Sequence, residues 1–177
     1  PSYTLAPDTR LSQITGQIAA AINHAAAHID GPIHLTGHSA GGHLVSRMVS
    51  ETSPLLSDTL SRVKNTVSIS GLHDLRPLLN TSMNDVLGLD AQEAVMESAA
   101  LHRPALPCSI TCWVGADERP EFVRQHDLLA NIWTGLGAST RAVHAPDKHH
   151  FNVISDLAEP DSDLTACLLT PINPEDI

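Results

Sequence analysis

Apolar and polar residues alternate along this chain with two periods, one typical of helices and one typical of strands. Between residues 11 and 29, apolar residues recur every three or four positions, which predicts an amphipathic helix with one buried stripe. Gly31 and Pro32 follow this pattern and are expected to end the helix. The apolar residues of the stripe are Leu11, Ile14, Ile18, Ile22, Ala25 and Ile29.

The rest of the chain repeats this switch between strand-like and helix-like segments. The segment 71–107 contains several prolines and is expected to be irregular, with two short helices. Such alternation predicts an α/β fold, a mainly parallel sheet of four or five strands with helices on both faces. No repeat or linker divides residues 1–177, which are expected to form a single domain. Strands are predicted at residues 2–5, 33–36, 66–70, 109–114 and 140–144, and further helices at 40–49, 121–136 and 151–157.

Composition narrows the classes of function. The formal net charge is -10, so the chain would repel a phosphate backbone, and no nucleic-acid partner is expected. No stretch approaches the roughly 18 consecutive apolar residues of a membrane helix, so no membrane partner is expected either. Cys108, Cys112 and Cys167 are odd in number and widely spaced, which predicts buried reduced thiols rather than a disulfide framework. Reduced thiols favour a cytoplasmic location.

One short motif carries chemistry. Gly37-His38-Ser39-Ala40-Gly41 matches the pattern G-x-S-x-G and falls between a predicted strand and a predicted helix. A serine on such a turn is held out at the end of the sheet, where the N–H of Ala40 and the positive helix end can stabilise an oxyanion. An ordinary glycine-rich turn could show the same letters, but the flanking elements favour Ser39 as a nucleophile.

A serine hydroxyl reacts only when a base takes its proton, and that base needs an acid to orient it. In folds with this motif the acid and the histidine follow the serine in that order, each after a later strand. The last two predicted strands are followed by Asp117 and Glu118, and by His149 and His150, respectively. Spacing alone leaves both pairs of alternatives open.

No metal or organic cofactor is expected. His24 and His28 lie four residues apart on a predicted helix and could share an ion, but the sequence offers no third ligand beside them. A solvated helix face is the favoured interpretation. His38 and His43 flank the serine and are expected to line the pocket or to pack beside it.

Beyond the pentapeptide, the sequence resembles the kynurenine formamidase (arylformamidase) group within the esterase/lipase branch of the α/β-hydrolases. The matching segments span nearly the whole chain and are far more specific together than the pentapeptide alone. They are Tyr3–Asp8, Gly37–Leu44, Ser70–Leu78, Thr81–Asn84, Pro120–Gln125 and His150-Phe151.

This resemblance implies roles for the ambiguous residues. In similar proteins the acid stands two residues before the Pro-Glu-Phe segment, which indicates Glu118, with Asp117 as the alternative. The histidine of the group directly precedes a Phe, which indicates His150. The implied activity is acyl transfer from a small carboxylic ester or an aryl formamide such as N-formyl-kynurenine. The expected partner is thus a small-molecule substrate, and a homodimer is an assembly that the resemblance allows.

The irregular segment is expected to form a wall of the substrate pocket. Asn80, Ser82 and above all Asn84 are candidates for polar contacts with the substrate, as is His38 beside the serine. Roles in loop capping and turns explain the three residues of the segment equally well.

The sequence departs from the family at its start. Similar enzymes carry a His-Gly-Gly segment whose N–H groups complete the oxyanion hole, and this sequence contains none. That segment is expected upstream of Pro1, so the chain is expected to be N-terminally truncated, with roughly the C-terminal two-thirds of the fold and without its first strands. A truncated, non-catalytic binding module is therefore the alternative function.

Overall fold

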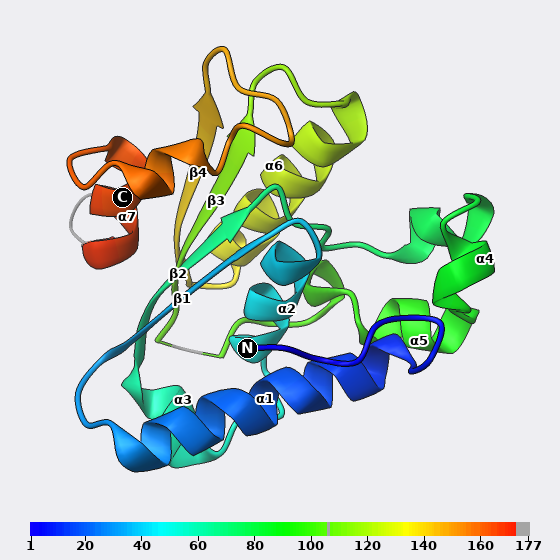
Figure 1. Ribbon diagram of the computed structural model, residues 1–177, viewed down its shortest axis with the longest axis horizontal. Helices are drawn as coiled ribbons and strands as arrows, with labels where there is room; N and C mark the ends of the chain where they lie inside the picture. The colour runs from blue at the N-terminus through cyan, green and yellow to red at the C-terminus, as the bar shows by residue number, and fades with distance from the viewer. Residues whose placement is uncertain (106, 173–177) are drawn as a thin grey trace.

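The computed structural model describes residues 1–105 and 107–172. Four parallel strands form one sheet in the order β1-β2-β3-β4, so strands that follow each other in the chain are neighbours in the sheet (Figure 1). Helical segments connect them, and the predicted α/β fold is confirmed. The strands are β1 (Ile33–His38), β2 (Val63–Ile69), β3 (Ser109–Gly115) and β4 (Ser139–Ala145).

Helices cover both faces of the sheet, as predicted. One face packs against α2 and α6, with α1 behind α2, and the opposite face packs against α7 (Figure 1). Because side chains alternate along a strand, Ile110 and Cys112 belong to the first core, whereas Trp113 belongs to the second. These helices are α1 (Leu11–His28), α2 (Ala40–Met48), α6 (Pro120–Gly135) and α7 (Asp163–Leu169).

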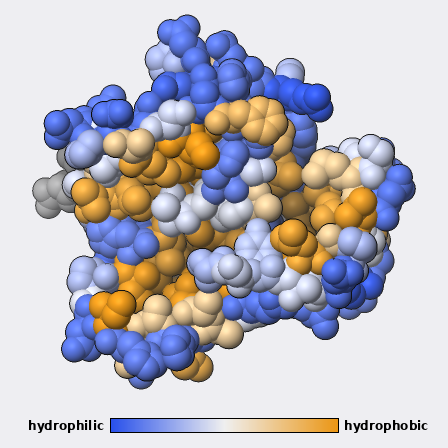
Figure 2. Space-filling model, in the orientation of Figure 1, coloured by the Kyte–Doolittle hydropathy of each residue, from blue (hydrophilic) through white to orange (hydrophobic). Residues whose placement is uncertain are grey.

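The segment predicted to be irregular forms a lobe beside the sheet, which Figure 1 shows on the right. The two short α-helices expected there are present, and two short 3-10 helices accompany them. Apolar surface gathers on the lobe (Figure 2), where Met83 and Val86 are exposed. Its elements are η1 (Arg76–Asn80), α4 (Asn84–Leu87), α5 (Ala91–Met96) and η2 (Ala99–Leu101).

Two predicted elements are wrong. Residues 2–5 do not form a strand: the first residues run beside α1 (Figure 1), and the N–H of Thr4 bonds to the side chain of Gln17 on α1. Residues 151–157 do not form an α-helix. They make turns, partly because the Asn152 side chain accepts the N–H of His149, and the turns end in the 3-10 helix η3 (Ser155–Ala158).

Two helices were not predicted. Helix α3 (Ser57–Arg62) is a short segment with only Thr59 buried, so it has almost no apolar stripe. Helix α7 begins at a cap in which the Ser162 hydroxyl accepts the N–H of Thr165. Its buried Leu164 and Cys167 then pack on the second core.

The three cysteines are free and buried, as predicted. Burial raises the pKa of the Cys108 and Cys112 thiols to about 12, because an apolar surrounding disfavours the thiolate. Within residues 1–105 and 107–172, no helix is both long and apolar enough to cross a membrane.

Candidate active site

The turn between β1 and α2 places Ser39 in an unusual backbone conformation. Its φ is 56° and its ψ is -114°, a region that non-glycine residues rarely adopt. The turn is also tight, because a Cβ on Gly37 would lie 2.2 Å from the carbonyl oxygen of Gly41. The N–H of Ser39 bonds to the carbonyl of Ile69 at the end of β2, at 2.8 Å. The first glycine of the motif is therefore needed by the backbone around the serine.

The structure brings Ser39, His150 and Glu118 into one line of contacts. His150 Nε2 lies 3.1 Å from Ser39 Oγ, and His150 Nδ1 lies 2.7 Å from Glu118 Oε2. The Glu118 side chain is fully buried, whereas the His150 side chain is 20% exposed. A buried carboxylate at this distance fixes the orientation of the imidazole and leaves the other ring nitrogen facing the serine.

The two alternatives from the sequence lie elsewhere. Asp117 is exposed, although it directly precedes Glu118. His149 is also exposed, and its Nδ1 accepts the N–H of Phe151 at 3.2 Å. Neither residue contributes to the contacts between Ser39 and the buried carboxylate.

Sequence reasoning missed two further contacts on the buried carboxylate. The hydroxyl of Ser70 donates a hydrogen bond to Glu118 Oε1, and the N–H of Gly115 donates to the same oxygen at 3.0 Å. Together with His150, three polar groups surround the carboxylate, which offsets the cost of its burial. The signal for Ser70 was its place at the end of β2, the strand that pairs with β1.

Backbone hydrogen bonds join the start of each loop that follows β2 or β3 to the end of the neighbouring strand. The N–H of Ser70 bonds to the carbonyl of Trp113, and the N–H of Ala116 bonds to the carbonyl of Ala145. A Cβ on Gly115 would lie 2.3 Å from the carbonyl oxygen of Lys148, so only glycine allows the loop after β3, which carries Glu118, and the loop after β4, which carries His150, to approach this closely. The sheet and these contacts fix the positions of the two loops relative to each other.

Two curated vertebrate proteins are similar over nearly the whole chain. The kynurenine formamidase of Salmo salar is 31% identical over 177 residues, which cover 94% of this chain and 59% of that protein. The kynurenine formamidase of Danio rerio is 30% identical over 179 residues, with 96% and 60% covered. The chain thus spans about three fifths of the length of these relatives. No family model matches it.

Solved structures show the same arrangement of elements. A crystal structure of a Silicibacter protein, provisionally named a thioesterase, has a TM-score of 0.88 and 47% identity, and covers 96% of this chain and 63% of its own. The chain has the α/β-hydrolase fold. The unliganded esterase 2 of Thermogutta terrifontis shares it with a TM-score of 0.60 at 18% identity, over 82% of this chain and 57% of its own.

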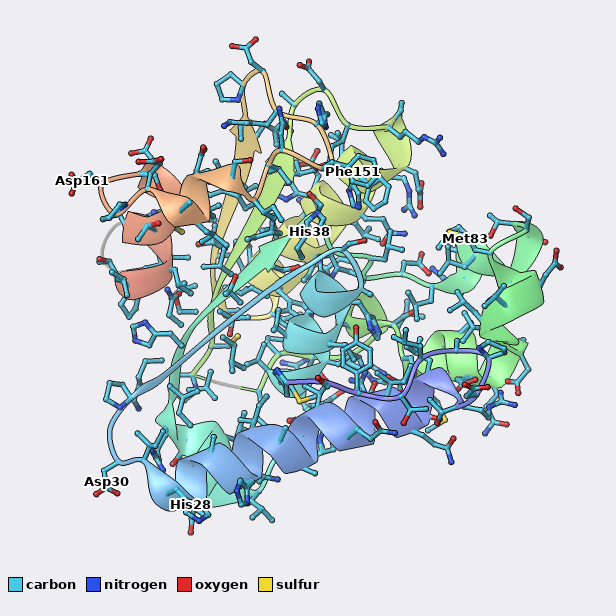
Figure 3. All side chains as sticks on the ribbon, viewed as in Figure 1. His28, Asp30, His38, Met83, Phe151 and Asp161 are labelled. Carbon is cyan, nitrogen blue, oxygen red and sulfur yellow. The ribbon has the colours of Figure 1, made fainter. Side chains whose placement is uncertain are left out.

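In this α/β-hydrolase fold, aromatic rings surround His150. The Phe122 ring lies 4.3 Å from the imidazole between centroids, and the Phe151 ring lies edge-on at 5.4 Å. Phe151 is 81% exposed, and Figure 3 places it near His38 at the same end of the sheet. The side chain of His38 bonds through Nε2 to the carbonyl of His150, at 2.8 Å.

His38 therefore contacts the loop after β4 that carries His150. Burial lowers the pKa of His38, and the charge of neighbouring His150 lowers it further, which favours the neutral form of the ring. A substrate contact for His38 remains a prediction.

The lobe residues proposed to contact substrate lie farther than His38 from the end of the sheet that carries Ser39. The side-chain amide of Asn84 donates through Nδ2 to the carbonyl of Leu89 and accepts the N–H of Leu89 at Oδ1, which closes the loop after α4. In Figure 3 the neighbouring Met83 lies well away from His38. Asn80 and Ser82 are exposed on the same lobe. Substrate contacts for these three polar residues remain predictions.

Two buried histidines lie on or beside α2, namely His43 within the helix and His73, which contacts Ser46 of the same helix. His43 packs beside the site rather than into it, because its Nε2 bonds to the carbonyl of Glu97 at 2.7 Å. His73 lies between the hydroxyls of Ser46 and Ser68. Burial lowers the pKa of His73 to about 3, with smaller contributions from the charges of neighbouring histidines, so it is neutral at pH 7.

Proposed function

We propose that this chain carries the acyl-transfer site of a serine hydrolase. The observation that supports this most directly is the contact line from Ser39 Oγ through the two nitrogens of His150 to Glu118. A serine, an imidazole and a buried carboxylate in this order form the arrangement that makes a hydroxyl nucleophilic. The names of the similar vertebrate proteins and of the solved structures are consistent with a hydrolase.

The proposed reaction has two steps. His150 Nε2 takes the proton of Ser39 as the hydroxyl oxygen attacks the carbonyl carbon of the substrate. Glu118 holds the ring and stabilises its positive charge. The same nitrogen then gives the proton to the leaving alcohol or amine, and the acyl group stays on the serine. His150 then takes a proton from a water molecule as the water oxygen attacks the acyl carbon, and it returns that proton to Ser39 Oγ as the bond to the serine breaks and the carboxylic acid leaves.

Ala40 is proposed to stabilise the negative oxygen that forms in each step. It is the first residue of α2, and the first N–H groups of a helix have no carbonyl partner one turn earlier. The positive end of the helix adds to the attraction. Loss of one such donor typically costs about 100- to 1000-fold in turnover.

The proposed substrate is a small carboxylic ester or an aryl formamide of the N-formyl-kynurenine kind. The two vertebrate relatives described above are named kynurenine formamidases, which supports the formamide. The rings of Phe122 and Phe151 beside His150 offer apolar surface against which an aryl group could stack. A cytoplasmic location and a homodimer remain part of this proposal.

The test is hydrolysis of N-formyl-kynurenine beside p-nitrophenyl acetate by the full-length protein, with Ser39→Ala as the control. Formamide turnover that disappears in the variant would support the formamidase. Turnover of the ester alone, lost in the same variant, would make the protein a general carboxylesterase.

The alternative is a binding module without catalysis. Labelling by a fluorophosphonate separates the two, because only an activated serine reacts with this reagent. Label that is absent from the folded wild-type protein, together with no turnover of either substrate, would contradict the hydrolase and favour the module.

A further inference from the structure

Three potential metal ligands meet outside the proposed active site. His126 and Asp127 are adjacent on α6, and His144 lies on β4. Their ligand atoms all lie within 4.8 Å of one another. Asp127 Oδ1 is 2.8 Å from His144 Nε2 and 3.8 Å from His126 Nε2. His144 lies 17 positions after Asp127 in the chain. The sequence spacing of the three residues therefore gave no indication of a metal site.

His126 supplies an independent observation. Its side chain is 1% exposed, and its Nε2 is among the few buried side-chain polar atoms of the described residues that have no hydrogen-bond partner. Buried polar atoms are nearly always satisfied, so an atom of this kind that faces other ligand atoms points to something that binds there. The proposed hydrolase does not use this nitrogen.

The other two ligands leave the cluster accessible. The side chains of Asp127 and His144 are 51% and 44% exposed, so an ion could enter from solvent while His126 closes the inner side. In a tetrahedral zinc site with bonds of about 2.0–2.1 Å, ligand atoms lie about 3.4 Å apart. The separations of 2.8 and 3.8 Å lie on either side of this value, so small side-chain movements would suffice.

We propose that His126, Asp127 and His144 form a binding site for a divalent transition-metal ion of the zinc class. Two imidazole nitrogens and one carboxylate oxygen are the donors that Zn²⁺ accepts, and water would complete four ligands. A hard ion such as Mg²⁺ prefers oxygen donors and is not expected to compete.

The site would join α6 to the end of β4. Helix α6 carries Phe122, which packs on His150, and β4 leads into the loop that carries His150. A bound ion would thus tie together two elements beside the proposed active site without touching Ser39. Its expected effect is on stability, because an ion that binds only the folded state shifts the folding equilibrium.

The test is calorimetric titration of the EDTA-treated full-length protein with ZnCl₂, together with thermal unfolding. We expect one ion per chain, and a melting temperature raised by about 5 °C or more at zinc concentrations near a hundred times Kd. The substitutions H144A and D127N alter exposed ligands and should each weaken binding by at least about tenfold. Circular dichroism confirms that each variant is folded.

The matched control is the double variant H24A/H28A, which removes two exposed histidines from α1 and should bind zinc like the wild type. Co²⁺ substitution should give visible absorption bands of a four-coordinate ion that H144A abolishes. The absence of saturable zinc binding would overturn the proposal and leave a simple His144–Asp127 hydrogen bond. Binding that survives both H144A and D127N would also overturn it.

Discussion

Ser70 donates a hydrogen bond to the same Glu118 oxygen that accepts the N–H of Gly115, while the other oxygen contacts His150. Ser70 is fully buried, and its φ of 49° turns the chain sharply at the end of β2. It directly follows β2, which lies between β1 and β3 in the sheet, and its hydroxyl bonds to Glu118. We therefore expect Ser70 to act as a positioning residue through the carboxylate.

The variant Ser70→Ala should lower kcat by about ten- to a hundredfold and leave KM unchanged, because one hydrogen bond to a buried charged group is lost. Steady-state kinetics on the preferred substrate measure both constants. Ser68→Ala is the matched control, since its hydroxyl bonds to the carbonyl of Gly42 at 2.9 Å rather than to Glu118. Equal losses of kcat in the two variants would indicate a purely structural role.

The variant Glu118→Gln should lower kcat by about 10³- to 10⁴-fold, because an amide no longer stabilises the imidazolium or fixes its tautomer. The neighbouring variant Asp117→Asn should keep wild-type activity, since Asp117 is exposed and makes no contact with His150. Turnover of each variant under saturating substrate decides between them. A reversed result would assign the acid role to Asp117.

The variant Gly115→Ala should destabilise the protein by about 1–3 kcal/mol, because the new methyl group would meet the carbonyl of Lys148. Activity should fall as well, since this contact joins the loops that carry Glu118 and His150. Gly16→Ala is the control: it lies inside α1, where a Cβ meets nothing within 4 Å, and should stabilise by about 0.5–1 kcal/mol. Urea unfolding measures both changes, and equal stability of G115A and wild type would contradict the expected clash.

Folding stability should fall as the pH drops below about 6.5. The pKa of His73 is about 3 in the folded protein, whereas an exposed histidine in the unfolded chain has a pKa of about 6.5. Above pH 6.5 His73 is neutral in both states and adds no pH dependence. Between these values only the unfolded state binds the proton, so each pH unit costs about 1.4 kcal/mol.

Urea unfolding at several pH values between about 4 and 7 measures this slope. The variant His73→Asn should reduce this slope, and buried His126, whose pKa is lowered to about 4, should keep part of it, whereas His24→Asn on the exposed face of α1 should not change it. An unchanged slope in H73N would show that other groups cause the acid sensitivity.

The parts of the fold that repeat simple patterns could be predicted from the sequence. The stripe of α1 and the alternation in the strands arise from burial of one face, so their positions follow from residue type. The motif around Ser39 and the order of acid and histidine follow in the same way, because strand ends meet at one edge of a parallel sheet. Glu118 and His150 were indicated by the family resemblance. In the structure His150 contacts Ser39 through one ring nitrogen and Glu118 through the other.

Other parts depend on contacts that spacing does not encode. Phe151, Val153, Ile154 and Leu157 have a helix-like spacing, yet Phe151 is exposed near His150 and the segment forms turns. Ser70 and Glu118 meet only because β2 and β3 end side by side. The convergence of His126 and His144 likewise requires the packing of α6 on β4.

The hydrogen bonds that link the start of each loop to the end of the neighbouring strand affect how the sequence of such a protein can evolve. Ser39 is tied to Ile69, Ser70 to Trp113, and Ala116 to Ala145, so the spacing of the reactive groups is set at the strand ends. The lobe that includes α4 and α5 projects away from these ties (Figure 1). Insertions or deletions within the lobe can therefore accumulate while the spacing of Ser39, Glu118 and His150 is preserved.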